Sequence, residues 1–229
     1  MCIRDSLRPS TFVLNDKKWN IERDGELIIR NNFLHASNIH FTQGFQEISA
    51  ETEEEDGGNT NNLNINLKNV YLGDITSMFF KNPRMEGISS GDVVLRDFFG
   101  KFNAEADLKT EQFRMDEDSV GLVNITAKYN DETGLIPFTV RSENDGYHVK
   151  ASGSYNVKDS VENPLKTDIQ LENTKVNILH RFIGDIFSDI TGTARGNLSI
   201  NGNPNSPDLL GKLSLRKACL LYTSPSPRD

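Results

Sequence analysis

The chain has almost no cysteine. Its only two cysteines, Cys2 and Cys219, lie near the two ends of the 229 residues. The long stretch between them therefore offers no disulfide framework, zinc site or thiol nucleophile. Such a segment suits an oxidising compartment, where unpaired thiols are avoided.

Long apolar runs and an excess of basic residues are also missing. No apolar run approaches the roughly 18 residues that a membrane-spanning helix needs. The 25 Lys and Arg are outnumbered by 33 Asp and Glu, which gives a net charge of -8. Nucleic acid is therefore not an expected partner, because a basic face is needed to neutralise phosphates.

The residue types that carry catalysis or hold metals do not gather into a recognisable site. No nucleophile, base and orienting group occur together, so we predict no enzyme, no catalytic residues and no cofactor. His35 and His40 would lie on opposite faces of one regular strand, which argues against a shared metal. The stretch from Asp116 to Gly121 imitates an EF-hand start, but Val120 occupies a ligand position and Ala127 replaces the bidentate Glu.

The two ends do not read as parts of a domain. Residues 1–6 and 219–229 resemble translations of the two orientations of a transposase sequencing adapter. We therefore interpret both as non-native scars and residues 7–218 as an internal fragment of a longer protein. Removing both ends is expected to leave the fold intact, because neither carries the strand pattern described next.

Alternation of apolar and polar residues dominates the sequence. Successive strand side chains point to opposite faces, so each alternating run predicts a strand with one apolar face. This pattern is typical of antiparallel sheets. The apolar positions include Trp19/Ile21, Leu27/Ile29, Ile39/Phe41, Leu63/Ile65/Leu67, Ala104/Ala106/Leu108, Val123/Ile125/Ala127, Ile136/Phe138/Val140, Val149/Ala151/Tyr155, Ile169/Leu171, Leu198/Ile200 and Leu213/Leu215.

Turns and short helices separate these runs. Asn144-Asp145-Gly146 predicts a tight hairpin. The acidic and then Gly- and Asn-rich stretch from Thr52 to Asn62 predicts a long exposed loop. Apolar residues at helical spacing predict two short amphipathic helices, Asp74 to Lys81 capped by Asp74, and Asn177 to Asp189 with Asn177 as a possible N-cap.

The helices belong to an internal repeat. Its copies lie near residues 63–95 and 167–200, and each reads as strand, helix, Gly-x-x-x-Gly and strand. The two glycine pairs, at 87/91 and 192/196, lie 105 residues apart. Such a repeat indicates an extended, quasi-linear β protein.

The stretch Phe187 to Gly202, followed by Pro207-Asp208-Leu209-Leu210-Gly211, resembles the TamB branch of the AsmA-like, bridge-type lipid transfer proteins of the Gram-negative envelope. The family reads there as G-x-x-x-G, apolar alternation, G, and then P-x-L-x-G. The resemblance covers most of residues 9–218. It implies a long curved antiparallel sheet that forms an open apolar groove, in a periplasmic protein whose inner-membrane anchor lies outside this fragment.

The resemblance also implies a function. It implies transport of phospholipid between the two membranes, or assistance to outer-membrane protein assembly with a BamA-like partner that binds parts outside this fragment. Phospholipid acyl chains are then the expected ligand, and the fragment is expected to be monomeric. The residues predicted to line the groove are Ile136, Phe138, Val140, Val149, Ala151 and Tyr155.

The alternation alone leaves a second reading open. A structural or adhesin-type β-solenoid would show the same pattern but fill its apolar face with stacked side chains. The two readings differ in whether that face is open or closed.

Overall fold

The computed structural model describes residues 2–22, 24–55, 58–77, 84–158, 162–179, 187–203 and 206–222. Its main feature is one 13-stranded antiparallel sheet. The strands are β2 (Ser10–Leu14), β3 (Lys17–Ile21), β6 (Ile39–Gln43), β7 (Gln46–Glu55), β8 (Gly58–Tyr71), β9 (Met85–Arg96), β10 (Asn103–Met115), β11 (Asp118–Asn130), β12 (Leu135–Asn144), β13 (Tyr147–Asn156), β14 (Leu165–Lys175), β15 (Phe187–Asn203) and β16 (Ser206–Tyr222).

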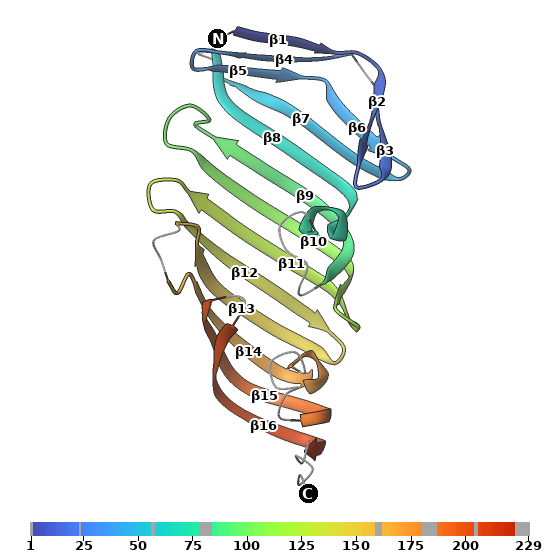
Figure 1. Cartoon of the computed structure of the whole chain (residues 1–229), viewed down its shortest axis with the longest axis vertical. Coiled ribbons are helices and arrows are strands. Elements are labelled where there is room, and N and C mark those ends of the chain that lie inside the picture. Colours follow the sequence, from blue (N-terminus) through green and yellow to red (C-terminus); the bar gives the residue numbers. More distant parts are fainter. Residues whose placement is uncertain are drawn as a thin grey trace, which may run out of the picture.

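The order of the strands follows the chain. From β6 to β16 each strand pairs with its sequence neighbours, and β3 and β2 continue the sheet beyond β6. The strands at its two ends, β2 and β16, do not pair with each other, so the sheet is open and twists along its length (Figure 1). The predicted mostly β, antiparallel architecture is confirmed.

The register gathers the apolar positions on one face. Ile125 lies opposite Val140, Val140 opposite Ala151, and Ala151 opposite Ile169. Residues directly opposite each other in a ladder share a face. One row of this kind crosses the sheet without interruption, through Ile48, Leu67, Gly91, Leu108, Ile125, Val140, Ala151, Ile169, Leu198 and Gly211.

A second, three-stranded sheet covers the N-terminal end of this face. It consists of β1 (Cys2–Leu7), β4 (Gly25–Arg30) and β5 (Phe33–Ser37), and it lies across that end of the large sheet in Figure 1. Strand β5 contacts β7 and β8. Leu34 and Ala36 are each only 2% exposed. The hydroxyl of Thr52 in β7 bonds both the amide N and the carbonyl O of Ala36 at 3.2 Å.

The hairpin prediction is confirmed and the loop prediction is wrong. Strands β12 and β13 meet at Asn144 and Tyr147, joined by two residues. The stretch predicted as an exposed loop instead belongs to the end of the β7–β8 hairpin, whose described pairing extends to Glu55 and Gly58. Glu51 and Glu53 flank Thr52, which is buried, so the charged residues concealed a strand whose other face is covered.

The two predicted helices differ from what the structure shows. Helix α1 spans Leu72–Thr76, so Asp74 lies in its first turn rather than at its cap, and residues 78–81 lie outside the described part. After β14 the chain forms a 3-10 turn, η1 (Val176–Leu179). The helix predicted up to Asp189 is wrong at its end, because Phe187–Asp189 already belongs to β15; residues 180–186 lie outside the described part. Phe187 continues the helical spacing of the apolar residues before it, so local spacing does not mark where β15 begins.

Bulges recur at matching places in the two stretches of the sequence repeat. Asn69 in β8 and Asn173 in β14 both have positive φ, 55° and 47°, and each coincides with a shift of register against the following strand. An unpaired residue of this kind bends its strand. Asn suits the position because its short polar side chain tolerates left-handed backbone.

The described parts of both terminal segments lie in strands. The first is β1, which pairs with β4 from Cys2↔Arg30 to Leu7↔Gly25. At the other end β16 reaches Tyr222 alongside β15. That these ends can be removed without loss of the fold stays a prediction, and trimming the chain tests whether these pairings are needed.

Candidate functional site: an open apolar face

The six predicted lining residues share one face of the central sheet. Ile136 lies opposite Tyr155, Val140 opposite Ala151, and Phe138 opposite Gly153. Val149 follows on the same face, opposite Leu171 of β14. All six side chains are half-buried rather than buried.

One long edge of this face is covered by short segments. Leu72 of α1 packs in a buried cluster with Phe113, Val120, Val123 and Tyr147. Val176 and Leu179 of η1 form a second cluster with Leu171, Ala194 and Leu198. Figure 1 shows α1 and the turn after β14 along this edge, which is called the α1 edge below.

The apolar face therefore divides into two bands. The covered band comprises Val123, Tyr147, Leu171, Ala194 and Leu198, all buried. The open band comprises Ile136, Phe138, Ala151 and Tyr155, which belong to neither buried cluster. Val140 and Val149 lie between the bands, because each packs partly against a cluster.

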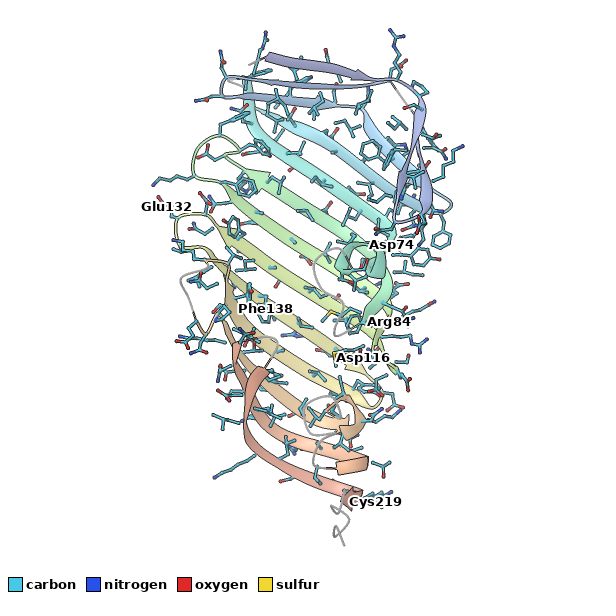
Figure 2. All side chains as sticks on the ribbon, in the orientation of Figure 1. Asp74, Arg84, Asp116, Glu132, Phe138 and Cys219 are labelled. Atoms are coloured by element: carbon cyan, nitrogen blue, oxygen red, sulfur yellow. The ribbon has the colours of Figure 1, made fainter. Side chains whose placement is uncertain are left out.

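The open band lies toward the opposite long edge. Figure 2 places Glu132, in the turn after β11, at that edge, and Asp74, Arg84 and Asp116 at the α1 edge. The edge marked by Glu132 is called the far edge below. No described segment packs a buried apolar cluster over the open band.

The reverse face of the sheet is polar. Lys128 and Glu105, opposite each other on β11 and β10, form an ion pair of 3.2 Å. Arg141 and Lys150 are a further opposed pair on β12 and β13, and both are exposed. Water can solvate this face, so the apolar face is the one that needs a cover.

Two tyrosines of the apolar face have perturbed pKa values. Burial raises the pKa of Tyr147, partly offset by its hydrogen bond with Asn177, with nearby Asp118 adding to the rise. Tyr129 donates a hydrogen bond of 2.9 Å from its hydroxyl to Asp131, and this bond raises its pKa. The pKa shift of Tyr147 therefore reports on packing, and that of Tyr129 reports on its hydrogen bond to Asp131.

The sites considered for metals are taken up by structural contacts. His35 lies on β5 and His40 on β6, so they are not on one strand as the spacing argument assumed. His40 Nδ1 is 3.7 Å from Glu22 and its Nε2 is 3.7 Å from Glu47. The backbone N–H of Arg84 donates to Asp116 at 3.0 Å, and Asn177 contacts Asp118. Within the described ranges, no group of three potential ligand side chains converges.

Comparison with models of known families, with curated proteins and with solved structures found no match to this chain. Among the residues that the structure describes, no helix has the length and apolar character needed to cross a membrane.

Sequence reasoning missed a cluster of aromatic rings at the far edge. Phe98, Phe99 and Phe102 lie in or beside the turn between β9 and β10, and Phe102 contacts Tyr129 of β11 with ring centroids 5.8 Å apart. The signal was present as Phe98-Phe99 within a turn, where exposed aromatic side chains are uncommon.

Proposed function

We propose that the open band holds acyl chains of phospholipid, and that the chain is a lipid-conducting segment of a TamB-like protein of the Gram-negative envelope. In this proposal the segment belongs to a periplasmic protein that carries phospholipid between the two membranes. The main supporting observation is an apolar face that is continuous across neighbouring strands, yet the described segments cover it only along one edge and at one end.

The energetics favour a long flexible ligand. A buried methylene contributes roughly 0.8 kcal/mol, so about fourteen methylenes contribute at most around 11 kcal/mol. The open band itself lies on two strands, β12 and β13. The row from Ile48 to Gly211 on the same face crosses the strands from β7 to β16 at about 4.8 Å each, which exceeds the length of one acyl chain. An acyl chain lying across the strands would therefore contact residues from several of them, and no single residue would dominate.

A closed structural β-solenoid remains the alternative. It requires the apolar face to be filled by stacked side chains of its own coils. The antiparallel, sequential pairing and the unjoined end strands favour an open surface instead. Assistance to outer-membrane protein assembly with a BamA-like partner is a further role that the resemblance implies, and it is compatible with the same surface.

The test places a charge in the open band and measures lipid and stability separately. Phe138→Asp should abolish co-purification of phospholipid, detected by mass spectrometry of extracted lipid, because an acyl chain would have to desolvate the carboxylate. The thermal melt should change little, since the carboxylate reaches water in the lipid-free protein.

The matched control is Thr139→Asp, one residue along on the polar face of the same strand. It should leave both lipid and melt unchanged. Lipid retained by Phe138→Asp would exclude this face as the binding surface, and unfolding of that variant would favour a closed core. Val149→Asp is a less direct test, because Val149 packs against the buried Leu171 cluster.

A further inference from the structure

The turn between β9 and β10 presents a chain of aromatic rings at the far edge. Phe99 and Phe98 have ring centroids 5.3 Å apart, and Phe98 and Phe102 have centroids 6.0 Å apart. Phe102 then contacts Tyr129. This set of four residues, Phe98, Phe99, Phe102 and Tyr129, is called the aromatic turn below.

The aromatic turn continues the apolar face past the ends of the strands. Tyr129 lies opposite Ala104, which belongs to the apolar face. The carbonyl of Phe102, two residues before Ala104, accepts a hydrogen bond from the Asp131 amide at 3.1 Å. The pairing between β10 and β11 therefore continues past the strand end, and the ring of Phe98 packs against Phe102 there.

The turn is held in place by its own polar contacts. The carboxylate of Asp97 accepts a hydrogen bond from the Lys101 amide at 2.7 Å, and the Asp97 carbonyl accepts one from Gly100 at 3.0 Å. Asp97 itself has a φ of 50°, a left-handed conformation. The rings are therefore presented by an ordered turn, although Phe98 remains 37% exposed.

The described charges beside the aromatic turn are not predominantly cationic, because the carboxylates of Asp97 and Asp131 lie in or next to it and two of its lysines are paired. Lys101 pairs with Glu132 at 2.7 Å, and Lys128 pairs with Glu105 at 3.2 Å. Unpaired lysines would attract an anionic membrane surface, but these two lysines are paired with carboxylates. The local chemistry fits an apolar chain whose headgroup has no net charge.

We infer that the aromatic turn is the side entrance through which an acyl chain of a zwitterionic phospholipid reaches the open band. This inference rests on the proposed function. The α1 edge is blocked by the clusters around Leu72 and Leu179. The far edge offers the exposed ring of Phe98 and the half-buried rings next to it, which shield part of the acyl chain from water before it reaches Ile136 and Tyr155. A contact that the acyl chain makes only while it enters lowers the free-energy barrier for both uptake and release. It therefore changes the rates of uptake and release more than the amount of lipid bound at equilibrium.

The experiment follows uptake of a fluorescent-acyl phosphatidylcholine from quenched phosphatidylcholine vesicles by stopped flow. The double variant Phe98→Ser/Phe99→Ser should take up the probe about tenfold more slowly, while the amount bound at equilibrium stays the same. The control is Phe45→Ser, which removes a ring that is 54% exposed and packs on Tyr71 beside α1. It should take up the probe at the wild-type rate.

The outcomes separate this inference from the proposed function. Wild-type protein that takes up no probe from phosphatidylcholine vesicles or from otherwise matched anionic vesicles contradicts the proposed function and this inference with it. Wild-type uptake with an unchanged rate in the double variant overturns the side entrance alone, as does uptake only from anionic vesicles. If the double variant fails to fold, Phe98→Ser alone, at the most exposed ring of the turn, decides by the same rate comparison.

Discussion

The covered band and the open band belong to one face of one sheet, yet they differ in burial. Val123 is 1% exposed and Tyr147 is 4% exposed, whereas Phe138 and Tyr155 are only half-buried. Both bands have the same alternation of apolar and polar residues. The difference arises from α1 and η1, which lie over one band only. Alternation therefore determines which face of the sheet a side chain lies on, while its burial depends on whether α1 or η1 covers that part of the face.

The largest expected effect comes from placing a charge in each band. Val123→Asp should lower the free energy of unfolding by several kcal/mol, because it buries an unpaired carboxylate under the α1 cluster. Phe138→Asp should cost far less, since water reaches it. Urea denaturation of both variants measures the contrast. Equal losses would mean that the open band is a closed core.

A smaller effect is expected from removing part of the cover. Leu179→Ala should lower the free energy of unfolding by about 2–4 kcal/mol, because it leaves a cavity between η1 and the sheet. Ile136→Ala, at a half-buried site of the open band, should cost about 1 kcal/mol or less. The same denaturation assay compares the two. A Leu179→Ala variant as stable as Ile136→Ala would show that η1 contributes no cover.

How much of this arrangement the sequence could predict follows from the same contrast. The strands and their facing were predictable, because Ile136, Phe138 and Val140 show a strict period of two. The β7–β8 hairpin was missed, because Glu51, Glu53 and Glu54 suggest solvent, while the burial of Thr52 depends on β5 from a distant part of the chain. The cover over Val123 was likewise beyond local patterns, because Leu72 lies 51 residues away in the sequence.

The six proposed lining residues illustrate the same limit. The sequence predicted that they share a face, and the register places them so. It did not distinguish Val149, which packs against the Leu171 cluster, from Ala151, which does not. Both have an apolar side chain between two polar neighbours, so only the position of η1 separates them.

The bulge that precedes η1 gives a prediction of about 1–2 kcal/mol. Asn173 has a φ of 47° at the point where β14 shifts register and turns toward Val176. A β-branched residue is strained in this conformation, so Asn173→Val should be destabilising by that amount. Asn173→Gly relieves the strain and should stay within a few tenths of a kcal/mol of wild type. A Val variant as stable as the Gly variant would mean that the backbone is not left-handed there.

The smallest expected effect concerns how the covered band responds to alkali. Burial raises the pKa of Tyr147 above its ordinary value of 10.0, so the unfolded chain gives up this proton first. Stability from Tyr147 is therefore complete below about pH 10 and is lost as the pH rises toward the folded-state value. At neutral pH, Tyr147→Phe should melt slightly lower than wild type, because Asn177 loses a hydrogen-bond partner at 3.2 Å. Between about pH 8 and about pH 11 the difference in melting temperature between wild type and variant should narrow, because the variant has no phenol at position 147 to deprotonate. The remaining tyrosines affect both proteins alike. Paired thermal melts across this range measure the gap. A gap that stays constant would show that Tyr147 reaches water as freely as the open band does.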